Sequence, residues 1–184
     1  MGCVKQDGIY RDGDLIVAPN PPKVVLAEAY LRFAKEDLLP QIFYEGVPDI
    51  DWFLETFSDP KSFTLGCYRA MGDSLSMQGL GWVNHVTEKP ADNFVRAEVG
   101  IAFFRATRLR AIRFGELMLT WIFENTPVDV IYGTTPEPNE KAWKYAERIG
   151  MKLVANIPWF TSWDGDPCGV WISHLTRKDW ALTA

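Results

Sequence analysis

The sequence predicts one α/β (α+β) domain over residues 1–184, built on a single mixed, mostly antiparallel sheet. A chain of 184 residues fits one domain, and a hydrophobic fraction of 47% is enough to build a core without disulfides. Neighbouring strand-like runs are separated by turn residues in several places, which is typical of antiparallel hairpins. One other pair of strand-like runs is separated by a long amphipathic helix, and a right-handed crossover of that kind makes two strands parallel.

The start of the chain predicts a hairpin and then a helix. Asp12-Gly13 separates two short apolar runs within 9–17, and both residue types tolerate the positive φ of a tight turn. Asn20 is expected to cap a helix that continues to about Lys35, because Pro21 suits the first helical position and apolar residues follow at helical spacing. A strand pair followed by one helix is therefore expected here.

A second helix and a second hairpin follow. Asp49 has the side chain of a helix N-cap, and Asp59-Pro60 ends the helix because proline disfavours helical backbone at the residue before it. Two runs over 62–69 and 75–86 have the composition of strands, and Gly72 lies in the turn between them. These two strands are expected to pair antiparallel.

The middle of the chain alternates between strand and helix. A strand-like run over 94–104 leads into a helix over 108–125, whose apolar residues recur at i, i+3, i+4 and i+7 and so face the sheet. A short apolar strand over 128–134 is expected to lie parallel to the first. Asn139 then begins another helix, and Gly150 supplies the left-handed residue that ends it. The remaining strands are expected as a hairpin at 152–163 and 168–175.

Two local motifs stand out within 60–175. The strand run Ala97-Glu98-Val99-Gly100-Ile101 is followed, after the long helix, by a helix that begins at Asn139, has Ala142 three residues later and ends at Gly150. This order of elements and these motifs resemble the acyl-CoA-binding region of the GNAT superfamily of N-acetyltransferases. The resemblance implies the GNAT fold, in which helices lie on both faces of the sheet and a central parallel strand pair is splayed.

The turn before the long helix resembles the family's phosphate-binding signature in altered form. In GNATs the signature (Arg/Gln)-x-x-Gly-x-(Gly/Ala) brings the N–H groups of a helix N-terminus to the diphosphate of acyl-CoA. Here Arg105 is kept, whereas Arg108 and Arg110 stand at the glycine positions, as in a divergent member. These arginines either contact phosphate or form a solvated helix face paired with acids such as Glu116. With acetyl-CoA as the implied cosubstrate, the expected cofactor-binding residues are Ile101, Ala102, Phe103, Arg105, Arg108, Leu109, Arg110, Ala111 and Asn139.

Three residues are candidates for proton transfer. Glu98 matches the strand position at which several GNATs place a general base for the amine, although strand glutamates often pair with a neighbouring cation instead. His85, on the strand expected beside Glu98, is the second candidate. The family tyrosine that protonates the departing thiolate is replaced by Ala146, and Tyr145 stands one position earlier, about 100° around the helix. The resemblance implies direct attack of the amine on the thioester.

The implied acceptor is an amine, either a small molecule or a protein N-terminus or lysine. In GNATs the segment after the first helix and the last hairpin wall the acceptor site, and aromatic residues in both suit an apolar pocket or a homodimer contact. Loss of the glycines and the tyrosine supports an alternative function, a catalytically inactive GNAT-fold binding or assembly protein. The aromatic residues of these segments are Phe43, Tyr44, Trp159, Phe160, Trp163 and Trp171.

Composition argues against several other classes. A net charge of −5 disfavours nucleic-acid binding, which depends on neutralising phosphates. The three cysteines lack the spacing of metal ligands, so no metal is expected. No apolar run reaches the roughly 18 residues of a membrane span and no secretory signal is evident, so a cytoplasmic protein is expected. Ser74 lies in a nucleophile-like Gly-Asp-Ser-Leu-Ser run, but Trp171 stands where an esterase of that class needs an aspartate before His174.

Overall fold

The computed structural model of the protein describes residues 4–6, 8–87, 94–107 and 109–182. Within these residues nine strands form one sheet, accompanied by α-helices and a short 3-10 helix. The strands are β1 (Val4–Gln6), β2 (Ile9–Asp12), β3 (Leu15–Pro19), β4 (Phe63–Met71), β5 (Ser74–Asn84), β6 (Arg96–Phe103), β7 (Val130–Pro136), β8 (Lys152–Trp163) and β9 (Asp166–Thr176). The helices are α1 (Lys23–Lys35), α2 (Leu39–Ile42), α3 (Ile50–Ser58), η1 (Arg105–Thr107), α4 (Ala111–Asn125), α5 (Glu140–Arg148) and α6 (Arg177–Ala181).

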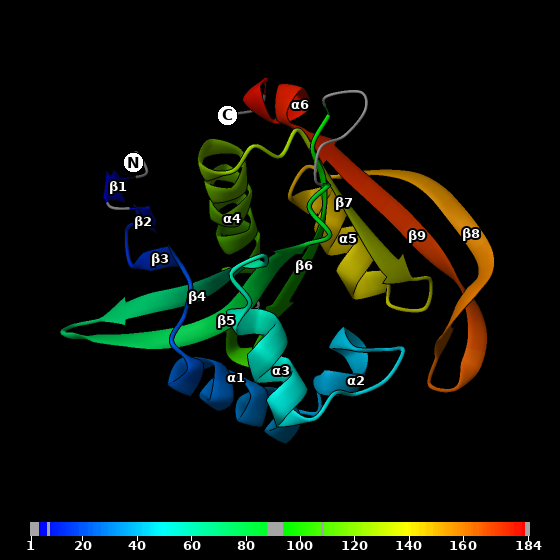
Figure 1. The fold of residues 1–184 in the computed structure, drawn as a ribbon, viewed down its shortest axis with the longest axis horizontal. Helices are drawn as coiled ribbons and strands as arrows, with labels where there is room; N and C mark the ends of the chain where they lie inside the picture. Colours follow the sequence, from blue (N-terminus) through cyan, green and yellow to red (C-terminus); the bar gives the residue numbers. More distant parts are fainter. Residues whose placement is uncertain (1–3, 7, 88–93, 108, 183–184) are drawn as a thin grey trace.

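The sheet order is β1-β2-β3-β4-β5-β6-β7-β9-β8. Neighbouring strands are antiparallel except for β6 and β7, which are parallel because α4 crosses between them. Helices α4 and α5 pack on one face of the sheet, and α1, α2 and α3 pack on the other (Figure 1). The predicted mixed, mostly antiparallel sheet with helices on both faces is confirmed.

The β2–β3 hairpin forms where the sequence predicts it, with its turn one residue later than expected. Asp12 pairs with Leu15, so Gly13 and Asp14 occupy the turn. Gly13 takes the positive φ, at +61°, which costs glycine little because it has no Cβ. Asp14 instead accepts a hydrogen bond from Arg69 Nε at 2.7 Å, which ties the turn to β4.

Helix α1 begins later than predicted, whereas α3 begins as predicted. Asn20 does not cap α1; its φ is +54° and its N–H donates to the Thr64 carbonyl at 2.8 Å. Asparagine tolerates left-handed backbone, so Asn20 forms the turn after β3, and the N-cap position falls to Pro22. By contrast, Asp49 accepts a hydrogen bond from the Trp52 N–H at 2.8 Å and caps α3.

Helix α4 also begins later than predicted, at Ala111, because η1 comes first. The hydroxyl of buried Thr107 donates to the Gln78 carbonyl of β5 at 2.8 Å, and the Arg110 N–H donates to the Thr107 carbonyl at 2.8 Å. The bond to β5 holds the chain in a tight turn at the end of β6 before α4 can start. Arg108, predicted as the first residue of the helix, lies outside the described residues.

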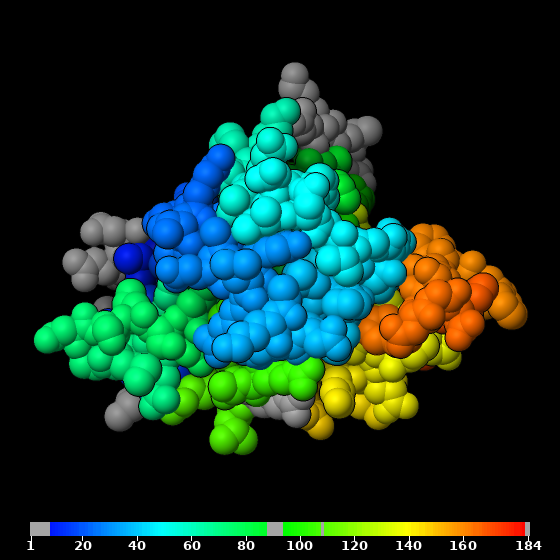
Figure 2. Space-filling view, turned by 90° about the horizontal axis from the view of Figure 1, so that it is seen from below, coloured from blue at the N-terminus to red at the C-terminus, as the bar shows by residue number. Residues whose placement is uncertain are grey.

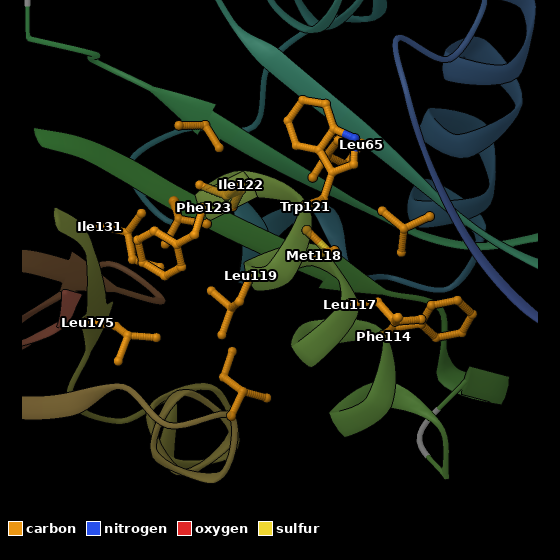
Figure 3. Close-up of a cluster of buried hydrophobic side chains, with 14 of the residues drawn as sticks. Leu65, Phe114, Leu117, Met118, Leu119, Trp121, Ile122, Phe123, Ile131 and Leu175 are labelled. Atoms are coloured by element: carbon orange, nitrogen blue, oxygen red, sulfur yellow. The ribbon is translucent and has the colours of Figure 1, made fainter. Parts of the chain in front are cut away.

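The larger core lies between the sheet, α4 and α5. Figure 3 shows the apolar side chains of α4 gathered against strands of the sheet, as their spacing predicts. Helix α4 approaches β5 closely at Gly81, where an added Cβ would lie 1.4 Å from Met118 Cε. A larger residue at this position would force the Met118 side chain to move. The buried residues of α4 include Phe114, Leu117, Met118, Leu119, Trp121, Ile122 and Phe123.

A second core lies under α1, α2 and α3. The rings of Phe33 in α1 and Phe104 are tilted against each other with centroids 4.7 Å apart, and the rings of Phe53 and Phe57 in α3 have centroids 4.5 Å apart. Figure 2 shows these helices, in blue to cyan, as a continuous cover on this side of the molecule. The β8–β9 hairpin, in orange, projects beside them. The segment that joins α2 to α3 therefore lies next to the last hairpin, and Thr161 of β8 donates to Glu45 Oε1 at 3.4 Å.

Strands β6 and β7 separate soon after they meet. Their register runs from Arg96 with Val130 to Glu98 with Tyr132, and no further pair follows in the described parts of the two strands. Each strand nevertheless continues beyond this point, and β7 remains paired with β9 along its length. The splayed parallel pair expected from the sequence is therefore confirmed.

Candidate active site

The parting of β6 and β7 opens a cavity of about 590 Å³. Its walls come from residues 99–104, from 133–136 of β7, from α5 and from the segment between α1 and α3. A cavity of this volume is in the range of small-molecule sites. Several expected site residues line it, namely Ile101, Ala102, Phe103, Arg105, Ala111, Asn139 and Tyr145.

Other expected cofactor residues lie outside this lining. Leu109 is fully exposed, and Arg110 Nη2 lies 3.7 Å from Asp14 Oδ2 on the β2–β3 turn. Arg113, in the first turn of α4, donates through Nη1 to Glu116 Oε2 at 2.7 Å. The guanidinium groups of Arg110 and Arg113 are thus paired with acids, one of the two arrangements that the sequence left open.

The backbone N–H of Arg105, at the start of this turn, already has a carboxylate as its acceptor. Glu36, just after α1, accepts a hydrogen bond from the Arg105 N–H at 2.6 Å and another from Arg32 Nε at 2.9 Å. Burial opposes ionisation of this carboxyl group, but the two hydrogen bonds outweigh it and hold its pKa below the ordinary value of 4.5. An ionised acid therefore lies beside Arg105, at the edge of the cavity.

Asn139 holds the N-cap position of α5 without using its side chain as a cap. Its backbone carbonyl accepts from the Ala142 N–H at 3.0 Å, and its side chain makes no capping hydrogen bond. The residue lines the cavity. Its side chain therefore does not serve as the helix cap, and the binding role remains a prediction.

Tyr145 connects α5 to the first turn of α4. Its hydroxyl donates to the Ala111 carbonyl at 2.9 Å, and burial raises the pKa of the phenol well above its ordinary range. An added Cβ at Gly115 would lie 2.2 Å from this hydroxyl, so the glycine makes room for the ring. The phenol lines the cavity, remains protonated and sets the distance between the two helices.

Glu98 lies in a chain of hydrogen bonds that runs from β5 to the segment after α2. Its Oε2 is 2.9 Å from His85 Nδ1, and its Oε1 accepts from the Thr134 hydroxyl at 3.2 Å. The Thr134 oxygen is in turn 3.4 Å from the Tyr44 hydroxyl. The expected proximity of Glu98 and His85 is present, and His85 has the uncommon φ of +50° that brings its ring to this position.

The aromatic residues expected around the acceptor site take different positions. Tyr44 lines the cavity, whereas Phe43 packs against the rings of α3. Trp159 and Phe160 lie where the β8–β9 register shifts, and their exposed fractions are 79% and 58%. Within the described residues the last hairpin therefore carries exposed aromatic surface near its bend, outside the cavity wall.

Sequence reasoning missed two residues of this region. Thr134 lies two positions beyond Tyr132, the partner of Glu98, and so shares its side of the sheet; the strand register is needed to see this. Glu36 is 69 residues from Arg105 along the chain, and nothing near either residue indicates the contact. Both residues come to the site through tertiary structure alone.

Two further observations on the described residues concern metal ligands and membrane-spanning helices. Among the described residues no group of three or more His, Cys, Asp or Glu side chains is placed to hold a metal ion. None of the helices described is long and apolar enough to cross a membrane. Ser74, the rejected nucleophile, lies in the β4–β5 turn region and donates to the Met71 carbonyl at 3.0 Å.

Comparison with known proteins gives matches in structure only. No protein-family model matches this sequence, and no curated protein matches it. The spermidine N-acetyltransferase of Vibrio cholerae, with CoA and spermine, matches with a TM-score of 0.76 and 14% identity over 92% of this chain and 99% of its own. The ribosomal-protein-S5-alanine acetyltransferase of Vibrio fischeri matches with a TM-score of 0.73 and 13% identity, over 94% of this chain and 98% of its own. A GNAT-family acetyltransferase of Bacillus anthracis matches with a TM-score of 0.69 and 14% identity, over 92% of this chain and 99% of its own.

The chain has the GNAT fold. The structural matches cover 92% and 94% of the chain, more than the 60–175 over which the sequence carries the resemblance. At 13% to 14% identity the likeness concerns the fold. The activity of this GNAT-fold protein therefore has to be argued from its own residues.

Proposed function

We propose that the protein is an acyl-CoA-dependent N-acyltransferase that moves an acetyl group from acetyl-CoA to an amine by direct attack. The observation that carries this proposal is the cavity that opens where β6 and β7 part. Beyond Glu98, one edge of β6 is left without a strand partner among the described residues, and residues 101–103 line the cavity. Backbone groups on such an edge need partners, and the amides of a pantetheine arm supply them.

The diphosphate of acetyl-CoA is proposed to lie where α4 begins. The first turn of a helix leaves N–H groups without helical partners, and the helix dipole favours an anion there. Arg105 contributes a cation at this end of the cavity, and the amide of Asn139 faces the pantetheine arm. The CoA-bound spermidine N-acetyltransferase among the structural matches supports acetyl-CoA as the cosubstrate.

Glu98 is the proposed base, and His85 holds its Oε2. The acceptor ammonium loses one proton to Glu98, its neutral nitrogen attacks the thioester carbonyl carbon, and an N–H group of β6 stabilises the oxyanion. The C–S bond then breaks, the departing thiolate takes a proton from the acid, and the nitrogen gives up its second proton, which restores the acid. Tyr145 is the proposed acid, because the residue lines the cavity and its phenol remains protonated; to give up the proton, its hydroxyl leaves the Ala111 carbonyl.

The acceptor is proposed to be a primary amine, small or at a protein N-terminus or lysine. The structural matches include an enzyme named for spermidine and one named for an N-terminal alanine of a ribosomal protein. Spermidine and a short peptide with N-terminal alanine are therefore the two probe amines. Release of free CoA thiol with each amine reports transfer, and acetyl-CoA without amine is the control for hydrolysis.

Thermal unfolding with acetyl-CoA tests the cofactor half of the proposal. A ligand present at a hundredfold its dissociation constant adds roughly 2.7 kcal/mol to the free energy of unfolding. For a domain of this size we expect a rise of roughly 5 to 10 °C in Tm. Citrate at the same concentration controls for a nonspecific anion effect, and an equal rise with citrate would contradict the proposal.

The second candidate function is a GNAT-fold binding or assembly protein without catalysis. The Glu36 carboxylate favours it, because this acid takes the Arg105 N–H at 2.6 Å and places negative charge where a diphosphate would lie. Absence of any Tm change at millimolar acetyl-CoA, together with no thiol release, would support this candidate over the enzyme.

A further inference from the structure

The proposed base does not itself reach the cavity. Glu98 and His85 are absent from the residues that line it, whereas Thr134 and Tyr44 are present. Thr134 lies between Glu98 and the cavity, since its hydroxyl bonds to Glu98 Oε1 at 3.2 Å. An amine in the cavity would therefore meet the hydroxyl groups of Tyr44 and Thr134 before it meets the carboxylate.

The hydrogen bonds between these groups have a direction. An ionised Glu98 can only accept, so the hydroxyl hydrogen of Thr134 is directed to Oε1. The Thr134 oxygen is then the acceptor in its contact with Tyr44, and the phenol is the donor. This contact is long, at 3.4 Å, and the relay requires it to shorten when the amine binds.

The other side of Glu98 is fixed by His85. The imidazole Nδ1 lies 2.9 Å from Oε2, which leaves Oε1 toward Thr134. The Glu98 side chain is 28% exposed, so water has access to the carboxyl group without passing through the cavity. A proton that arrives at Oε1 can therefore leave Glu98 to solvent.

Tyr44 is suited to pass a proton rather than to keep one. Burial raises the pKa of its phenol, and nearby Glu45 and Glu98 raise it further, against the effect of its hydrogen bond to Thr134. The group therefore remains a neutral hydroxyl, which can accept a proton on its oxygen as it releases its own. A resident tyrosinate base is disfavoured at this position.

We propose that the acceptor amine binds at Tyr44 and that Tyr44 and Thr134 relay its proton to Glu98. This inference rests on the proposed function. An N–H bond of the acceptor ammonium breaks and its proton joins the Tyr44 oxygen, the Tyr44 proton moves to the Thr134 oxygen, and the Thr134 proton moves to Glu98 Oε1. The lone pair left on nitrogen forms the N–C bond, and both hydroxyl groups are neutral at the end of the step.

Paired substitutions at Thr134 test the relay. Thr134→Val keeps the shape and removes the hydroxyl, and we expect kcat with spermidine or the alanyl peptide to fall roughly 100-fold, while the Tm rise with acetyl-CoA persists. Thr134→Ser restores a hydroxyl and should recover at least roughly a tenth of the wild-type kcat. If valine and serine lose kcat equally, packing rather than the hydroxyl is responsible and the relay is wrong.

Tyr44→Phe supplies the second test. We expect a loss in kcat similar to that of Thr134→Val, and the double variant should lose little more than either single variant, because both hydroxyl groups serve one path. Additive losses in the double variant would overturn the relay. Full activity of both single variants in an active protein would overturn the relay alone, whereas an inactive wild type that binds no acetyl-CoA would overturn the proposed function and the relay together.

Discussion

Each end of the cavity has one carboxylate nearby, but the two carboxylates differ in how they relate to a bound ligand. At the end where α4 begins, Glu36 accepts from the Arg105 N–H and so occupies a donor that an anionic ligand would use. At the other end, Glu98 lies behind the wall and reaches the cavity through the hydroxyl of Thr134. Under the proposed function, the first carboxylate would compete with the diphosphate, and the second would leave the cavity to the substrates.

Because of this difference, substitutions of the two carboxylates should distinguish the affinity for a CoA ester from the rate of amine transfer. Removal of charge at Glu36 should change how tightly a CoA ester binds, because the acid shares its site. Removal of charge at Glu98 should change how fast the amine reacts, because the acid is the proposed base and is not itself among the residues that line the cavity. Substitutions at the two ends are therefore expected to change different measured quantities.

The largest effect is expected for Glu98→Gln. Glutamine keeps the shape and still accepts from Thr134, but it cannot take a proton, so kcat should fall roughly 100-fold or more. The dissociation constant of acetyl-CoA, measured by calorimetry, should stay within about twofold of the wild-type value. A variant that keeps a third of the wild-type kcat would exclude Glu98 as the base.

Tyr145→Phe is expected to cost about 1 to 2 kcal/mol in the free energy of unfolding, measured with urea. The change removes the hydroxyl that donates to the Ala111 carbonyl at 2.9 Å and leaves that acceptor without this partner. Tyr30→Phe is the matched control, since Tyr30 donates to the Pro48 carbonyl at 2.9 Å outside the cavity lining. A loss of kcat in Tyr145→Phe, with none in Tyr30→Phe, would support Tyr145 as the acid; unchanged kcat would leave it a structural link.

Local signals in the sequence predicted most of the fold. Asp49 caps α3 and Gly150, with φ of +97°, ends α5, because each is decided by hydrogen bonds within one turn of helix. The parting of the parallel strand pair was implied by the resemblance, which rests on element order. The correct predictions therefore concerned either hydrogen bonds within one element or features implied by the order of elements along the chain.

The errors and omissions have non-local causes. Asn20 leaves its expected cap position to bond with Thr64, and the start of α4 shifts because Thr107 bonds to Gln78 of another strand. The same reason applies to Glu36, whose partner lies on a distant segment. Periodicity and capping rules describe one element at a time, and these contacts join two elements.

Glu36→Gln is expected to tighten acetyl-CoA binding. The amide oxygen of glutamine still accepts from the Arg105 N–H, but the negative charge beside the proposed diphosphate site is removed. Removal of one negative charge next to the proposed diphosphate site should lower the dissociation constant of acetyl-CoA roughly fivefold. Calorimetry at low and high salt measures the change, which should shrink as salt increases. Weaker binding would show that Glu36 organises the turn for the cofactor instead of competing with it.

The smallest effect is expected for Arg110→Ala. The Arg110–Asp14 contact is long, at 3.7 Å, and both side chains are about two-fifths exposed, so the free energy of unfolding should change by less than about 0.5 kcal/mol. Because Arg110 lies outside the cavity lining, acetyl-CoA affinity should stay within about twofold, whereas Arg105→Ala should lower it roughly tenfold. Equal losses in the two variants would mean that Arg110 leaves Asp14 to contact the ligand. In that case both arginines would act on the cofactor, Arg110 from a position where the GNAT signature has glycine or alanine.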